Sequence, residues 1–237
     1  NRAVLPSSSG VNWASMFTGA CPELHGYTTW NSATHEIPER VILKNNIFPT
    51  MFQLLRDAQP EAEIGCIYEW DGIKYVIDTL STSYQEMVPP SKIYTDEMAK
   101  MSVKYIKEKK PVLGAFIFDN PDHVGHDAGH DTPEYYANLK ELDEYIGQII
   151  QATKDAGIYE NCIFIVTSDH GGIDHGHGGK TLEEINTPFI IAGKGVKKGG
   201  EFQESMMQFD CAPTVLEIFG LEGPQVWVGR SMSQVFE

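Results

Sequence analysis

Apolar residues in the C-terminal half of the chain form two alternating patterns. Short continuous runs predict three buried strands, at 112–118, 162–167 and 188–192. Residues 132–156 place apolar side chains three or four positions apart, which predicts an amphipathic helix with Thr132 as its N-cap and a stop at Gly157. Apolar strands separated by long helices are typical of an α/β fold, in which a mostly parallel sheet lies between helices.

The N-terminal half continues this pattern with weaker signals. Residues 64–69 predict a strand, and three segments predict helices, at 11–18, 49–58 and 96–109. The segments 27–47 and 70–93 mix aromatic and polar residues and are expected to be irregular, as connections that carry function often are. A chain of 237 residues without repeats or a low-complexity linker favours a single domain, with 27–110 as a candidate region for cap or substrate-side insertions.

Composition narrows the range of partners. The formal net charge is −15, which argues against a nucleic-acid scaffold or an anionic membrane as the main partner, because both attract basic surfaces. No run of 18 apolar residues is present, so no membrane span is expected. The four cysteines form no C-x-x-C pair, which favours free thiols, although a disulfide stays open.

Two clusters of polar residues follow predicted strands. The first, 119–130, begins where the strand 112–118 ends and contains Asp122 and His126, four residues apart. The second, 168–179, follows the strand 162–167. Six of the eight histidines lie between His123 and His177, and ligand sites in α/β sheets gather at the carboxyl ends of strands. A capped polar turn would explain either cluster alone, but together they predict a site for divalent metal ions such as zinc or manganese.

A third element is the serine-rich segment that leads into the helix predicted at 11–18. A serine in such a position usually caps the helix. The N-terminus of a helix also attracts anions, and a serine there can act as a nucleophile if a bound cation lowers the pKa of its hydroxyl. Asn12 lies one turn further on and could donate to a phosphoryl oxygen.

Taken in order, these motifs resemble the alkaline phosphatase superfamily, nearest to its type I phosphodiesterase/nucleotide pyrophosphatase branch. The resemblance covers most of the chain. It rests on these elements: Ser9-Gly10-Val11-Asn12, Thr18-Gly19, Pro22-Glu23-Leu24-His25-Gly26, Asp122-x-x-Gly125-His126, Ser168-Asp169-His170-Gly171, Gly176-His177-Gly178-Gly179, Thr187-Pro188-Phe189 and Asp210-Cys211-Ala212-Pro213-Thr214.

The resemblance implies a reaction and a set of roles. Ser9, which stands nine residues before Thr18, matches the nucleophile that is transiently phosphorylated, and Asn12 matches a donor to a phosphoryl oxygen. One metal is matched by Asp122, His126 and His177, with His175 as the rival to His177, and the second by Asp169 and His170. The implied activity is hydrolysis of a phosphodiester or phosphomonoester, a small-molecule substrate, with two divalent ions, zinc or alternatively manganese, as cofactors. The family also favours a periplasmic or secreted location.

One departure from the family pattern concerns the second metal. The family supplies a further aspartate from the first strand of the sheet, upstream of the nucleophile. Here no acidic residue precedes Ser9, and the first aspartate of the chain is Asp57. The expectation is therefore a single domain, 1–237, that lacks its first strand because the chain is a fragment of a longer protein. Such a fragment is expected to bind the second metal weakly or not at all, and to be poorly active.

Of three alternative functions, two remain at this point. A sulfatase of the same fold needs Pro two residues and Arg four residues after the nucleophile, where this chain has Val11 and Trp13, so that subclass is rejected. A phosphosugar mutase of the same superfamily and a non-catalytic metal-binding or interaction module stay open. Candidate substrate-binding side chains are Trp30, Asn31 and Lys180, with Trp70 and Tyr75 as further candidates.

Overall fold

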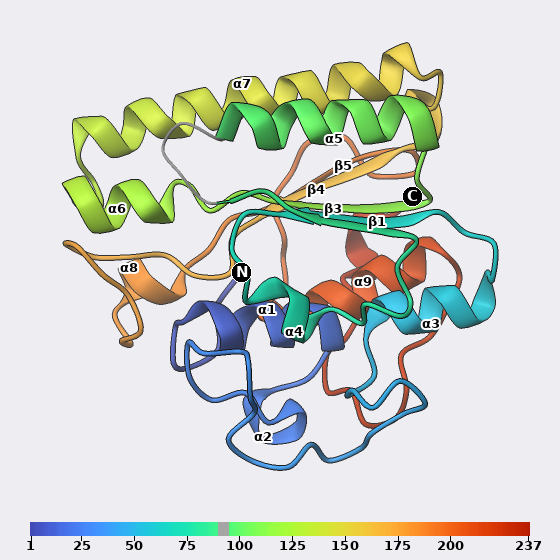
Figure 1. The fold of residues 1–237 in the computed structure, drawn as a ribbon, viewed down its shortest axis with the longest axis horizontal. Coiled ribbons are helices and arrows are strands. Elements are labelled where there is room, and N and C mark those ends of the chain that lie inside the picture. Colours follow the sequence, from blue (N-terminus) through green and yellow to red (C-terminus); the bar gives the residue numbers. More distant parts are fainter. Residues whose placement is uncertain (90–94) are drawn as a thin grey trace.

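Strands form the middle of three layers in the computed structural model, which describes residues 1–89 and 95–237 (Figure 1). On one face lie the two long helices, α5 (Thr95–Lys109) and α7 (Pro133–Asp155). The other face carries α1 (Ser9–Thr18), α3 (Met51–Ala58), α4 (Ile73–Val76) and α9 (Cys211–Ile218). The predicted α/β class, with strands between layers of helices, is confirmed.

The strands fall into two groups. In the first, β1 (Ile64–Tyr68) lies between β2 (Tyr84–Met87) and β3 (Leu113–Ile117) and runs parallel to both, with Ile64 opposite Leu113. In the second, β4 (Ile163–Thr167) pairs with β5 (Phe189–Gly193) in the antiparallel sense. The prediction of mostly parallel strands holds for β1–β3. The antiparallel β4–β5 pair was not foreseen, because the apolar content of a strand does not encode its direction.

Most predicted elements occur within two residues of their expected bounds. Thr132 caps α7 by accepting a hydrogen bond from Tyr135 N at 3.3 Å. Gly19 ends α1 with a φ of +60°, the left-handed conformation that glycine adopts readily. The short elements that complete the described chain are α2 (Pro22–His25), α6 (Asp122–Ala128), α8 (Leu182–Ile185) and the 3₁₀ turns Tyr159–Asn161, Gln208–Asp210 and Ser233–Val235.

The prediction that 70–93 is irregular is wrong at two places. The single turn α4 and the strand β2 lie within this segment, and residues 90–93 lie outside the described part of the chain. β2 reads Tyr-Gln-Glu-Met and is largely exposed, so it carries no apolar run that would mark it as a strand. The segment 27–110 therefore adds β1, β2 and α5 to the layers, and a substrate-side role for its loops stays a prediction.

Three apolar clusters hold the layers together in the described part of the chain, and the smallest joins α5 to α7. The largest lies beneath the strands, where Cys66 of β1 packs with residues of α1, α3 and α9 that include Phe17, Phe52 and Leu216. Ile67, the next residue of β1, points to the opposite face and packs with Met98 and Tyr105 of α5. All four cysteines are free thiols. In the described ranges, no helix is both long and apolar enough to cross a membrane.

Candidate metal centre

Three predicted ligands meet at the carboxyl end of β3. Asp122 and His126 stand one turn apart on α6, so their side chains share a face of the helix. Asp122 Oδ2 lies 3.3 Å from His126 Nε2, and Asp122 Oδ1 lies 3.7 Å from His177 Nε2. One ligand atom from each of the three residues falls within 4.8 Å of the other two, so together they can hold one metal ion.

A second pair of predicted ligands follows β4. Asp169 Oδ2 lies 3.3 Å from His170 Nε2, and the same nitrogen lies 3.1 Å from Ser9 Oγ. The hydroxyl that the sequence singles out as nucleophile thus contacts His170, one of the two candidate ligands of the second metal. Among the described residues, this half of the centre brings together two of the predicted ligands, against three in the first half.

Backbone carbonyls fix the tautomer of all three histidines. His126 Nδ1 lies 2.8 Å from His175 O, His177 Nδ1 lies 3.0 Å from Ser7 O, and His170 Nδ1 lies 2.8 Å from Gly171 O. A carbonyl oxygen only accepts hydrogen bonds, so each Nδ1 must carry the proton and donate it. Each Nε2 is then left with a lone pair for a metal ion, which is the arrangement that metal-binding histidines usually adopt.

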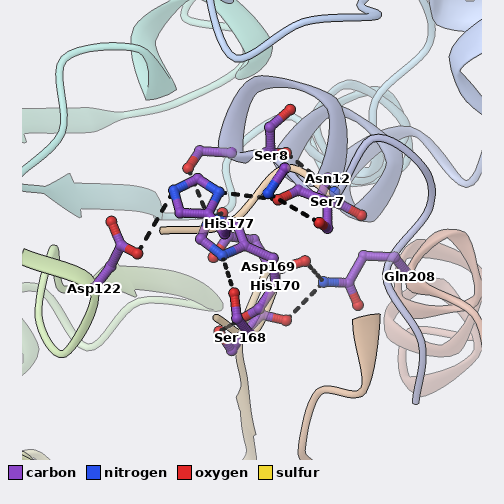
Figure 2. Close-up of polar contacts among 12 residues, drawn as sticks. Ser7, Ser8, Asn12, Asp122, Ser168, Asp169, His170, His177 and Gln208 are labelled. Carbon is purple, nitrogen blue, oxygen red and sulfur yellow. Dashed lines mark hydrogen bonds and ion pairs between the residues drawn. The ribbon is translucent and has the colours of Figure 1, made fainter. Parts of the chain in front are cut away.

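The two halves of the centre lie against each other. The imidazoles of His170 and His177 stack with ring centroids 3.7 Å apart, between Asp122 and the segment that carries Ser7 (Figure 2). Burial, together with His170, lowers the pKa of His177 and favours its neutral, metal-binding form. Asp122 Oδ1 and Asp169 Oδ2 are buried and accept no hydrogen bond from the described residues. Buried carboxylate oxygens in this condition fit a site for divalent cations.

The hydroxyls of the three neighbouring serines, Ser7, Ser8 and Ser9, lie in different hydrogen-bonding environments. Ser7 is fully buried, donates its hydroxyl to Gly179 O at 2.8 Å and accepts from Gly178 N at 3.1 Å. Ser8 is the N-cap residue of α1, and its hydroxyl is buried without a hydrogen bond to the described residues. Of these three hydroxyls in the described structure, that of Ser9 contacts a candidate ligand, His170, whereas Ser7 contacts His177 through its backbone carbonyl. The role of Ser9 as nucleophile stays a prediction.

Asn12 is placed differently from the expected phosphoryl donor. It is fully buried, and its amide nitrogen lies within hydrogen-bond distance of three carbonyl oxygens, of Val4 and Pro6 at 3.2 Å and of Ser8 at 3.0 Å. Its side-chain oxygen accepts from Val4 N at 2.8 Å. These contacts brace the turn before α1, so donation to a phosphoryl oxygen would require Asn12 to give up backbone partners. That catalytic role stays a prediction.

The candidate substrate-binding residues lie on two loops beside the turn that carries Ser7, Ser8 and Ser9. A β-carbon added at Gly10 would lie 2.7 Å from Trp30 O and 2.9 Å from Thr29 O, so glycine lets the loop that carries Trp30 and Asn31 approach Ser9. Lys180 follows Gly179, which is bonded to Ser7. All three side chains are exposed, with Trp30 at 67%. Their contact with a substrate stays a prediction.

Several residues support the centre without having been predicted from the sequence. Ser7 holds the loop of His177, and Gln208 donates to the backbone of Ser168 and Asp169. Nothing in a lone serine or glutamine signals such bonds in advance. Glu69, at the end of β1, accepts from Asp119 N at 2.8 Å, and burial raises its pKa to about 7.

Known proteins with similar sequences or folds perform several related reactions. Residues 1–198 match the family described as type I phosphodiesterase / nucleotide pyrophosphatase. A 2,3-bisphosphoglycerate-independent phosphoglycerate mutase from Acetivibrio thermocellus is 27% identical over 175 residues, 71% of this chain and 32% of the mutase. Arylsulfatase K from Bos taurus is 33% identical over 103 residues, 41% of this chain and 19% of the sulfatase.

A solved structure extends the likeness to the fold. Murine ectonucleotide pyrophosphatase/phosphodiesterase 5 is similar with a TM-score of 0.72 at 16% identity, covering 94% of this chain and 87% of that protein. The chain spans about a third or less of the length of the two curated relatives. Their names cover phosphoryl transfer and sulfate ester hydrolysis, so these relatives alone do not select one reaction.

Proposed function

Because the chain belongs to the type I phosphodiesterase / nucleotide pyrophosphatase family of the alkaline phosphatase superfamily, we propose that it hydrolyses phosphate esters at a centre of two divalent metal ions. The observation that carries the proposal is the contact of Ser9 Oγ with His170 Nε2 at 3.1 Å, beside two groups of candidate ligands. A nucleophile next to cation ligands is the arrangement that phosphoryl transfer through a serine requires.

Asp122, His126 and His177 would hold one ion, and Asp169 and His170 the other. When bound, the two ions supply positive charge that lowers the pKa of the serine hydroxyl and stabilises the oxygens of the phosphoryl group. Imidazole and carboxylate ligands suit zinc, and manganese is the alternative. The first half-site suits zinc, because its three candidate ligands leave one position of a tetrahedron open.

Ser9 performs the first chemical step in this proposal. Its oxygen attacks phosphorus, the bond from phosphorus to the leaving oxygen breaks, and the products are phosphoserine and an alcohol. Water then attacks the phosphoserine and the bond from phosphorus to Oγ breaks. Phosphate, or a phosphomonoester when the substrate is a diester, is released, and Ser9 takes up a proton given up by the attacking water. The N-terminus of the ten-residue helix α1 directs backbone N–H groups toward this position, where they favour the negative phosphoryl group.

The leaving group is proposed to lie over the exposed loops beside Ser9. Trp30 offers an aromatic surface, Asn31 an amide and Lys180 a positive charge in a chain of net charge −15. A cation on this side would favour an anionic substrate against the acidic background of the protein. The loops therefore support a small-molecule phosphate ester as the substrate, and they leave the choice between diester and monoester to experiment.

Turnover of p-nitrophenyl phosphate and bis-p-nitrophenyl phosphate, with and without EDTA, tests the proposal. We expect metal-dependent release of nitrophenol, and a loss on the order of a thousandfold or more in Ser9→Ala, because a nucleophile that acts as part of a unit is hard to replace. Ser205→Ala is the control. Ser205 is exposed and lies far from Ser9 in the sequence, so this variant should keep full activity. Metal binding without turnover of either ester would instead support a binding module.

A second candidate is phosphoryl transfer between positions of a sugar phosphate. It is favoured by the mutase from Acetivibrio thermocellus, whose similarity extends over 71% of this chain. A mutase and a hydrolase share the phosphoserine and differ in what accepts the phosphoryl group. Release of inorganic phosphate at the rate of nitrophenol would identify hydrolysis, whereas isomerisation of a phosphoglycerate without phosphate release would identify the mutase.

A further inference from the structure

Gln208 lies behind the second half of the metal centre. It belongs to the 3₁₀ turn Gln208–Asp210, before α9, and its side chain is fully buried. Its amide nitrogen donates to Ser168 O at 2.6 Å and to Asp169 O at 2.8 Å, and Figure 2 shows the side chain directed at this loop. An amide nitrogen has two hydrogens, and these two consecutive carbonyls take both.

The orientation of this amide is fixed from its other end. Gln208 Oε1 accepts a hydrogen bond from Asn1 Nδ2, which also donates to Thr187 Oγ1 at 3.0 Å. The backbone of Gln208 donates to Arg2 O at 2.8 Å. With its oxygen facing a donor and its nitrogen facing two acceptors, the carboxamide has a single orientation that satisfies all its partners.

The loop that follows β4 is held on both sides of its ligands. Gln208 binds the carbonyls of Ser168 and Asp169, and after the ligands Gly171 N donates to Glu184 O at 2.8 Å. The side chains of Asp169 and His170 project between these two anchors. Gln208 touches neither Asp122, His126 nor His177 through any hydrogen bond within the described ranges.

We propose that Gln208 is a positioning residue that holds Asp169 and His170 in the geometry required for the second metal ion and for contact with Ser9. The inference rests on the proposed function for the identity of these ligands. Removing the amide leaves two carbonyls without their donors, and relaxation of the loop to find new ones displaces the carboxylate and the imidazole. Partners of this kind typically change metal affinity or activity by about 10–100-fold when they are lost.

Two variants and one matched control test this role in the full chain. Gln208→Met keeps the length of the side chain and removes both donors, and Gln208→Glu keeps its shape but turns a carboxylate toward two carbonyl oxygens. Gln53→Met is the control, because Gln53 is equally buried on α3 and its side chain makes no hydrogen bond with the described residues.

The first measurement is amide hydrogen exchange of the metal-free proteins. Exchange in the peptide that covers 168–172 should accelerate by about tenfold or more in Gln208→Met, more in Gln208→Glu, and remain at the wild-type rate in Gln53→Met. Unchanged exchange in both Gln208 variants, or equal acceleration across the whole chain and in the control, would overturn the proposal.

The second measurement is titration with Co²⁺, followed by its visible absorption. In Gln208→Met the weaker binding event should lose about 10–100-fold in affinity, and the tighter event should stay within about twofold of wild type. Equal weakening of both events, or of neither, would contradict a role specific to the second half. If the wild type binds one cobalt ion only, the proposed two-metal centre fails, and hydrogen exchange alone decides the role of Gln208.

Discussion

Removal of the Ser7 hydroxyl should weaken both the fold and the first metal site. This hydroxyl donates to Gly179 O at 2.8 Å and accepts from Gly178 N at 3.1 Å, while the carbonyl of the same residue accepts from His177 Nδ1 at 3.0 Å. Ser7 is fully buried. Ser7→Ala therefore leaves one N–H and one carbonyl of the glycine loop without partners, directly beside the imidazole of a predicted ligand.

The size of the effect follows from these two groups. Each buried polar group left unpaired costs about 1–3 kcal/mol, so we expect a total of roughly 2–4 kcal/mol after partial relaxation of the loop. For a chain of this size, 1 kcal/mol corresponds to about 2–4 °C in Tm, which gives a fall of about 5–15 °C. Zinc affinity at the site of His177 should fall by about 10–100-fold, because the loop no longer holds the imidazole in one orientation.

The assay is thermal unfolding with EDTA and calorimetric titration with zinc. Ser102→Ala is the matched control, since Ser102 is also fully buried but only donates to Met98 O at 2.8 Å within its own helix. Its loss should cost about 1 kcal/mol or less. The reasoning would be refuted if Ser7→Ala bound zinc as tightly as wild type and lost no more Tm than Ser102→Ala.

Three further predictions concern metal content, pH and Asn12. Zinc titration of the chain should show one tight and one weaker site, at least about tenfold apart, because the first half-site offers three ligands and the second only Asp169 and His170; two equally tight ions would contradict this. The pKa of Glu69 is raised to about 7, so the folded state keeps this proton over a pH range in which the unfolded state, with its ordinary pKa of about 4.5, releases it. The stability of the metal-free protein should therefore fall by up to roughly 3 kcal/mol between pH 5 and pH 7. Denaturant titrations of Glu69→Gln should show no such loss. Asn12→Ala should lower Tm, because its contacts brace the turn before α1, whereas lost turnover at an unchanged Tm would favour the phosphoryl-donor role.

The apolar runs were sufficient to predict where β1, β3, β4 and β5 lie, but not how far each is buried. β1 is buried at all five positions and packs against helices on two sides. The predicted burial of the other three is wrong, because β3 and β4 are mostly half-buried and β5 is partly exposed, with Ile190 at 60%. β2 is exposed, so its side chains carry no comparable pattern. The antiparallel direction of β5 could not be predicted either, because it depends on the path of the chain from Ser168 to Pro188, which is fixed by tertiary contacts such as Gly171 N to Glu184 O.

The candidate centre was predictable where its chemistry is carried by unusual residue types. Histidines and aspartates crowded into two short segments after two strands are rare enough to indicate a shared site, and Asp122, His126 and His177 do converge. The supporting residues were not predictable, because Ser7 and Gln208 act through bonds to backbone atoms far along the chain. Such bonds depend on where the chain folds back and leave no local pattern in the sequence.

The choice between His175 and His177 shows how the backbone assigns a ligand. His175 Nδ1 donates to His126 O at 3.1 Å and His126 Nδ1 donates to His175 O at 2.8 Å, so the two residues exchange hydrogen bonds and tie α6 to the glycine-rich loop. His177, two residues on, is held by Ser7 with its Nε2 toward Asp122. One histidine therefore ties the two segments together, and the other is placed as the candidate ligand. Each of these imidazoles is held by a hydrogen bond to a backbone carbonyl of the protein. The orientation of the first half-site is therefore set when α6, the loop that carries His175 and His177, and the turn that carries Ser7 pack together.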